Sequence, residues 1–142
     1  VIGILKGSCI FYSDLIREIN LPIEIEFMSV SSYQDSSMSS GEVKIVKDVG
    51  TSVALKHVLF VEDIIDTGRT LSDIVKLLKA RNPLSLKVIT LLDKPSRRIV
   101  EFEADMALFT IPDHFVIGYG LDYNEFYRNL PYIAEYSEGE VE

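Results

Sequence analysis

Three carboxylates and a Thr-Gly-Arg-Thr run lie together in residues 62–70, and these are the residue types most suited to chemistry in the sequence. Glu62 and Asp63 directly follow an apolar run, and Asp66 comes three positions later. Carboxylate oxygens are good ligands for a hard cation and good acceptors for hydroxyl groups. We therefore expect Glu62 and Asp63 to hold either ribose hydroxyls or a hydrated Mg²⁺.

The Thr-Gly-Arg-Thr run leads into a predicted helix. A helix N-terminus presents unpaired backbone N–H groups and a partial positive charge, both of which favour an anion. Thr67 and Thr70 add hydroxyl donors, and Gly68 allows close backbone approach. Segment 62–70 is therefore predicted to bind a phosphate monoester. The alternative is an ordinary capped loop with solvated acids.

The apolar pattern predicts the elements that must position these residues. Strands are expected at residues 1–5, 23–27, 43–46, 58–61, 86–92, 106–111, 115–119 and 132–136, and helices near residues 10–19 and 71–78. Strands that alternate with helices indicate an α/β fold with a mainly parallel central sheet flanked by helices. The serine-rich residues 29–41 are predicted to form a loop, either a lid over the site or a plain flexible connection.

Composition narrows the class of protein. The 142 residues predict a single domain, residues 1–142, and 14 Lys+Arg against 22 Asp+Glu give a net charge of −8, which disfavours nucleic acid and anionic membranes. The single Cys9 excludes an internal disulfide, so we expect a reducing, cytoplasmic setting. The chain starts at Val1 within a predicted strand, and we expect its native N-terminal segment to be missing.

Segment 62–70 resembles the phosphoribosyl-diphosphate signature of the phosphoribosyltransferases, in particular their hypoxanthine-guanine members. Three further stretches and one residue match that family in the same order: residues 5–8 its diphosphate loop, Ser32-Tyr33 its mobile lid, Lys94 its purine-selecting lysine, and residues 115–128 its purine-hood segment. The resemblance implies the type I phosphoribosyltransferase fold with a small hood region. It also implies a Leu5-Lys6 peptide bond that is commonly cis.

The resemblance implies a role for each matching residue. Glu62 and Asp63 would hold the ribose diol and its Mg²⁺, Asp66 would handle the proton at purine N7, and Asp122 would hold a second Mg²⁺ bound to diphosphate. The expected contacts to the donor, 5-phosphoribosyl 1-diphosphate, come from Lys6, Gly7, Ser32, Tyr33, Glu62, Asp63, Thr67, Gly68, Arg69, Thr70 and Arg128. The expected contacts to the purine come from Lys94, Phe115, Val116 and Asp122.

Simpler interpretations exist for two of these residues. Asp66 could merely cap the following helix, and Lys94 could be a solvated loop lysine held before Pro95. His57 and His114 are expected to lie on the surface rather than to act as bases.

The resemblance implies a purine-salvage transferase that moves phosphoribosyl to N9 of hypoxanthine or guanine, giving IMP or GMP plus diphosphate. It implies Mg²⁺ as cofactor, small-molecule substrates, and a homodimer or homotetramer. One alternative is a related enzyme for adenine or a pyrimidine, against which Lys94 and residues 115–122 argue. The other is a nucleotide-responsive RNA- or DNA-binding regulator on the same fold, which the charge of −8 and the presence of Asp66 disfavour.

Overall fold

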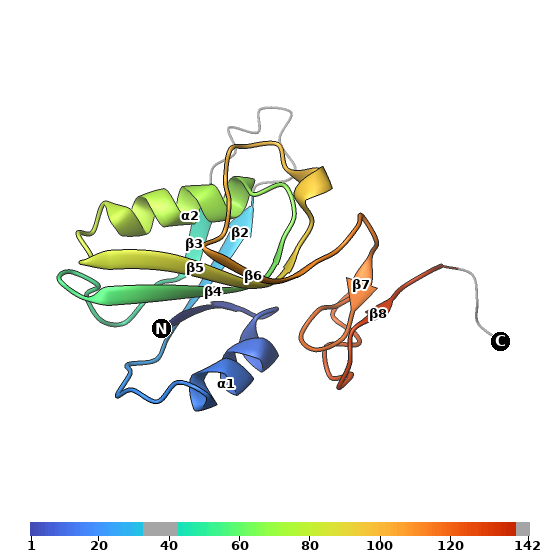
Figure 1. The fold of residues 1–142 in the computed structure, drawn as a ribbon, viewed down its shortest axis with the longest axis horizontal. Helices are drawn as coiled ribbons and strands as arrows, with labels where there is room; N and C mark the ends of the chain where they lie inside the picture. Colours follow the sequence, from blue (N-terminus) through green and yellow to red (C-terminus); the bar gives the residue numbers. More distant parts are fainter. Residues whose placement is uncertain (33–42, 139–142) are drawn as a thin grey trace.

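A six-stranded sheet forms the centre of the computed structural model, which describes residues 1–32 and 43–138 (Figure 1). Its strands are β1 (Ile2–Leu5), β2 (Glu26–Ser32), β3 (Val43–Lys47), β4 (His57–Ile65), β5 (Ser85–Asp93) and β6 (Met106–Thr110). They lie in the order β3-β2-β1-β4-β5-β6, and all neighbours are parallel except β3, which runs antiparallel to β2 at one edge. The predicted α/β fold with a mainly parallel sheet is confirmed.

Two helices, α1 (Cys9–Arg17) and α2 (Arg69–Lys79), lie on opposite faces of the sheet (Figure 1). The predicted apolar face of α2 is buried: Leu71, Ile74, Val75 and Leu78 are all at most 6% exposed. They belong to one core cluster with Val58 and Phe60 of β4, whereas Val61 belongs to the cluster under α1. β4 is therefore buried on both faces, as an all-apolar run in a parallel sheet should be.

Close packing of α1 on β1 fixes the diphosphate loop, residues 5–8. A Cβ atom at Gly3 would overlap the ring of Tyr12, so only glycine lets the helix approach the strand this closely. Ser8 is fully buried, and its Oγ donates to the carbonyl of Ile4 at 2.6 Å. The loop is thereby held at the carboxyl end of β1, and the Leu5-Lys6 peptide bond is cis.

The residues of the predicted site lie together at the carboxyl ends of the parallel strands. β1 leads into the diphosphate loop, β4 into segment 62–70, and β5 into Lys94 and the short 3₁₀ helix η1 (Pro95–Arg97). Beyond the same end lie β7 (Val116–Ile117) and β8 (Ala134–Glu135), which pair with each other (Figure 1). Ligands of open α/β sheets bind at carboxyl strand ends, so the fold places the candidate residues where such ligands are expected.

The second strand begins later than its sequence pattern predicts. Residues 23–25 alternate like a strand but are irregular, and the regular pairing with β1 begins at Ile2 and Glu26. β2 then continues through Ser32, so the prediction of a loop from residue 29 is wrong for residues 29–32. β2 pairs antiparallel with β3, the next strand along the chain. The rest of the proposed lid, including Tyr33, lies outside the described residues.

Two strands of the hood are shorter than predicted. Residues 115–119 and 132–136 contribute only the two-residue strands β7 and β8. β7 ends where Gly118, Tyr119 and Gly120, with φ angles of 94°, 51° and 100°, turn the chain out of an extended path. No helix within the described ranges is both long enough and apolar enough to cross a membrane.

Candidate active site

Glu62 and Asp63 lie in the last part of β4, inside the strand rather than after it. The backbone N–H of Asp63 donates to Glu62 Oε1 at 2.9 Å, and that of Ile64 donates to Asp63 Oδ1 at 2.7 Å. Burial, together with the neighbouring charge of Asp63, raises the pKa of Glu62 well above its ordinary range. Two carboxylates crowded in this way are the kind of oxygen ligands that a divalent cation would stabilise.

The raised pKa predicts how stability depends on pH. Because the pKa of Glu62 is higher in the folded chain, its contribution to stability is fully present below its ordinary pKa of 4.5 and is lost as the pH rises through the raised value. The free energy of unfolding should therefore fall across this range by a larger amount in the parent than in Glu62→Gln. Denaturant unfolding from pH 4 to pH 8 measures the difference, and identical pH dependence in the two proteins would contradict the assignment.

Gly7 brings the diphosphate loop against segment 62–70. A Cβ atom at position 7 would overlap Oδ2 of Asp63. The loop backbone thus lies directly against one of the predicted ribose and metal ligands. The two motifs, more than fifty positions apart in sequence, form one site.

Gly7→Ala should disturb this site more than the fold. The added methyl group must push the carboxylate of Asp63 aside, so we expect donor affinity to fall about tenfold or more, since misplaced binding groups are costly. Gly50→Ala is the matched control, because its Cβ would meet nothing closer than 3.6 Å. Donor binding measured by calorimetry should separate the two variants, and equal affinities would show that Asp63 does not bind the donor.

The start of α2 supports the predicted phosphate loop. Gly68 has a φ of 82° and occupies the N-cap position without a side chain to cap the helix. Among the described residues, Thr67 Oγ1 makes a long contact with the first turn, accepting from the Arg69 N–H at 3.4 Å. A Cβ there would approach Arg98 Cδ to 2.9 Å, so glycine is required both by conformation and by space. The following amides of the first turn are left for an anion, and the interpretation of Asp66 as a helix cap is wrong, because its carboxylate accepts from Arg97 instead.

Lys94 is buried, with only 7% of its side chain exposed, so its interpretation as a solvated loop lysine is also wrong. Its backbone N–H donates to the carbonyl of Ile65 at 2.9 Å, which places Lys94 next to Asp66. Its Nζ lies 3.8 Å from Oδ1 of Asp113, a weak ion pair for a buried ammonium. Asp66 Oδ1 in turn accepts a hydrogen bond from Arg97 Nε at 3.0 Å.

The purine-hood segment, residues 115–128, closes over the diphosphate loop. A Cβ atom at Gly120 would overlap the carbonyl oxygen of Gly7, so the two backbones are in close contact. Lys6 Nζ lies 2.9 Å from Glu125 Oε2, and the guanidinium of Arg128 lies 3.3 Å from Glu125 Oε1. The side chains of Lys6 and Arg128, both expected to contact the donor, thus lie close together on either side of Glu125.

Only some of the hydrogen-bond donors of the Arg128 guanidinium have partners among the described residues. Nη1 donates to the carbonyl of Gly120 at 2.7 Å, while Nε is buried without a hydrogen-bond partner among the described residues. A buried donor left unpaired costs stability, so this guanidinium is suited to gain from an added anion.

Asp122 does not join Glu62 and Asp63. It accepts a hydrogen bond from the backbone N–H of Glu125 and lies 3.6 Å from Arg128. Within the part of the chain that the structure describes, no three acidic, histidine or cysteine side chains are grouped to hold one metal ion. Asp122 therefore lies apart from the pair Glu62 and Asp63.

Phe115 is half-exposed, as a residue meant to stack on a base should be. Its ring meets those of Tyr123 and Tyr136 edge-on, with centroids 5.9 and 6.0 Å apart, and these tyrosines stack on each other at 4.4 Å. Val116 is half-buried in β7. His57 and His114 are exposed, as predicted.

Sequence reasoning missed Arg97, Asp113 and Glu125, which contact Asp66, Lys94 and the pair Lys6 and Arg128 respectively. Their only signal was their position in the sequence: Arg97 comes three residues after Lys94, Asp113 precedes the purine-hood segment by two residues, and Glu125 lies within that segment. A charged residue close to a motif is too common to single out without the three-dimensional contact.

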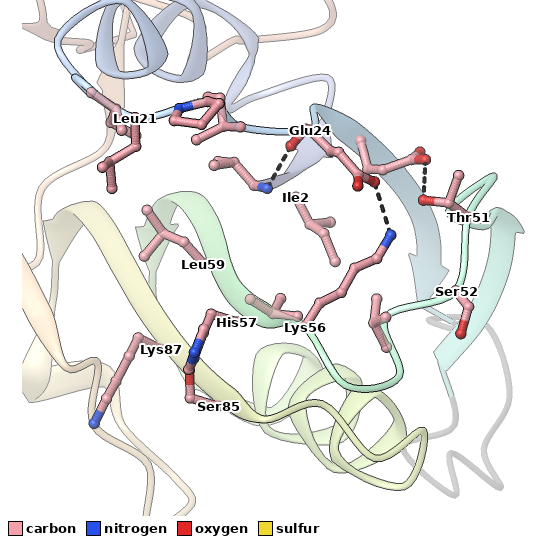
Figure 2. Close-up of a pocket in the computed structure, with 17 residues that line it drawn as sticks. Ile2, Leu21, Glu24, Thr51, Ser52, Lys56, His57, Leu59, Ser85 and Lys87 are labelled. Atoms are coloured by element: carbon pink, nitrogen blue, oxygen red, sulfur yellow. Dashed lines mark hydrogen bonds and ion pairs between the residues drawn. The ribbon is translucent and has the colours of Figure 1, made fainter.

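A cavity of about 560 Å³ lies elsewhere, at the amino ends of β1, β4 and β5 (Figure 2). Apolar side chains such as Ile2, Leu21 and Leu59 line much of it, and an ion pair between Lys56 and Glu24 lies at its side (Figure 2). This is the end of the sheet opposite to the candidate residues, and ligands of such sheets bind at carboxyl strand ends. The cavity is therefore not part of the candidate active site.

Comparisons with known proteins agree with this geometry. The family model of the phosphoribosyl transferase domain matches residues 1–124. A hypoxanthine-guanine phosphoribosyltransferase of Staphylococcus aureus is 55% identical over 133 residues, covering 94% of this chain and 74% of that protein. The crystal structure of a hypoxanthine phosphoribosyltransferase from the same species has a TM-score of 0.91 at 54% identity, covering 96% of this chain and 74% of that chain. The bifunctional protein TilS/HprT of Listeria monocytogenes is 56% identical over 134 residues, and this chain spans only 21% of that protein's length. The chain belongs to the phosphoribosyltransferase family, among its hypoxanthine-guanine members.

Proposed function

We propose that this chain transfers the phosphoribosyl group of 5-phosphoribosyl 1-diphosphate to N9 of hypoxanthine or guanine, giving the nucleotide and diphosphate. The placement of Lys94 beside Asp66, made by the hydrogen bond from Lys94 N–H to the Ile65 carbonyl, carries this proposal. An ammonium can only donate and a carboxylate can accept, which matches the O6 carbonyl and the neighbouring N7 proton of a 6-oxopurine.

The chain's own residues would share the chemistry as follows. The bond from the ribosyl C1′ to the diphosphate oxygen breaks, the bond from C1′ to N9 forms, and Asp66 takes the proton that the purine loses at N7. The amides at the start of α2 hold the 5′-phosphate, and Lys94 holds O6. Lys6 and Arg128 stabilise the negative charge of the departing diphosphate, which requires that they exchange Glu125 for the ligand.

Mg²⁺ fits the crowded carboxylates of Glu62 and Asp63, because burial and, after it, the neighbouring charge of Asp63 raise the pKa of Glu62, and a divalent cation would stabilise both carboxylates in their charged form. When bound there, it would orient the donor and help to neutralise its diphosphate. Asp122 would hold a second ion through the diphosphate, apart from the first pair.

The test is an assay of nucleotide formation from hypoxanthine, guanine, xanthine or adenine with the donor, with and without Mg²⁺. We expect turnover with a 6-oxopurine, little with adenine, and loss of activity in chelator that added Mg²⁺ restores. Turnover with adenine alone would overturn the proposal, and full turnover in metal-free buffer would overturn its metal part. Tight, salt-dependent RNA or DNA binding without turnover would instead favour a regulator.

The setting that we propose for this reaction is the cytoplasm, with small-molecule substrates and a homodimer or homotetramer as the assembly. A single cysteine and a net charge of −8 support the first two parts. Sedimentation of the purified protein would measure the assembly, and a monomer at micromolar concentration would contradict it.

A further inference from the structure

We propose that Arg97 is a positioning residue that holds the carboxylate of Asp66 in the orientation needed at purine N7, with Asp113 anchoring the far end of the arginine. The inference rests on the proposed function, because it concerns how Asp66 is prepared for that reaction.

The guanidinium of Arg97 bridges two carboxylates. Its Nε donates to Asp66 Oδ1 at 3.0 Å, and its Nη1 lies 3.5 Å from Asp113 Oδ2. The other oxygen of Asp113 lies 3.8 Å from Nζ of Lys94. The four side chains thus form an array of alternating charge, Asp66, Arg97, Asp113 and Lys94, whose two ends are the groups proposed to contact the purine.

The backbone delivers Arg97 to this place. Pro95 starts the 3₁₀ helix η1, and the N–H of Arg97 donates to the carbonyl of Lys94 at 3.0 Å. This tight turn folds the chain back, so that a side chain three positions after Lys94 reaches Asp66 at the end of the adjacent strand. The carbonyl of Asp66 is fixed independently by Arg98 Nη1 at 2.7 Å, which leaves its side-chain orientation to Arg97.

Among the described residues, only one of the two carboxylate oxygens of Asp66 accepts a hydrogen bond. Oδ1 accepts from Arg97, and no residue in the described ranges donates a hydrogen bond to Oδ2. A planar guanidinium fixes a carboxylate oxygen in direction as well as in distance, unlike the compact ammonium of lysine. Arg97 therefore holds one oxygen and keeps the other directed away from itself, available to a purine proton.

The same contacts contribute little to folding. The side chains of Arg97, Asp66 and Asp113 are 48%, 45% and 52% exposed, and ion pairs at such positions add little to stability. If this array orients the reacting groups without stabilising the fold, substituting Arg97 should lower the reaction rate while the protein still folds. This combination makes the role measurable.

A double-mutant cycle tests the inference. In the parent, Arg97→Gln should lower kcat with hypoxanthine by about tenfold while the KM for the donor stays the same, since only the proton-accepting group is misplaced. In an Asp66→Asn background the same change should lower kcat by less than about twofold, because the group that Arg97 holds is already removed. Arg97→Lys should recover part of the loss, and the denaturant midpoints should all agree.

Arg81→Gln is the matched control. Arg81 also pairs with a carboxylate, that of Asp48, through two hydrogen bonds of 2.8 and 2.7 Å, but far from segment 62–70 in the fold. We expect its kcat to equal that of the parent. Equal, independent losses from Arg97→Gln in both backgrounds, or no loss in the parent, would overturn the inference. A parent without 6-oxopurine turnover would instead overturn the proposed function, and an Asp66→Asn variant of full activity would overturn the role of Asp66 on which the inference rests.

Discussion

Asp66→Asn should lower kcat by about 10²–10⁴ and leave the fold intact, because it removes a proton acceptor while keeping the size and shape of the side chain. The structure excludes the main structural explanation for such a loss, since in the described part of the chain the Asp66 carboxylate accepts from Arg97 and not from the first turn of α2. The ion pair with Arg97 is about half exposed and is worth less than about 1 kcal/mol. The hydrogen bond from Arg98 goes to the backbone carbonyl, which the substitution does not change.

Measuring kcat and the free energy of unfolding on the same preparations decides the role of Asp66. Asp73→Asn makes the identical chemical change on α2, outside segment 62–70, and should keep the parent's kcat. If Asp66→Asn lost about 1 kcal/mol of stability and kept its rate, Asp66 would be a structural residue.

Lys94→Gln should change which purine the protein prefers. The ammonium of Lys94 offers donors only, which suits the O6 carbonyl of hypoxanthine and opposes the 6-amino group of adenine. Since its side chain is only 7% exposed, an unsuitable base leaves a buried charge with only the long contact to Asp113 at 3.8 Å. A glutamine amide can also accept, so we expect the ratio of kcat/KM for hypoxanthine over adenine to fall by about 10³-fold or more, within the range seen where a site is built around a hydrogen bond.

Lys87→Gln is the control for this prediction. Lys87 lies on β5, the strand that leads to Lys94, and its Nζ is also 3.8 Å from a carboxylate, but its side chain is 68% exposed. The substitution should leave the ratio unchanged. An unchanged ratio in Lys94→Gln would place selectivity elsewhere, most simply in the backbone at Val116.

The sequence alone determined the parts of this protein that depend on neighbours along the chain. Segment 62–70 joins a buried strand to a helix within nine residues, so its acids, glycine and threonines must lie together in any fold that keeps those elements. The apolar period of 3.6 placed α2, and the unbroken apolar run of β4 indicated a strand covered on both faces, because burial repeats with the geometry of the element.

Only the tertiary structure decided which distant segments meet. The start of β2 depends on where β1 offers partners, the overlap of Gly7 with Asp63 on the packing of two loops, and the contact of Arg97 with Asp66 on the alignment of β5 beside β4. Local periodicity shows which side chains are buried but not which strand lies beside which. Contacts such as these arise from strand register and loop packing, which are settled only when the whole chain minimises its exposed apolar surface.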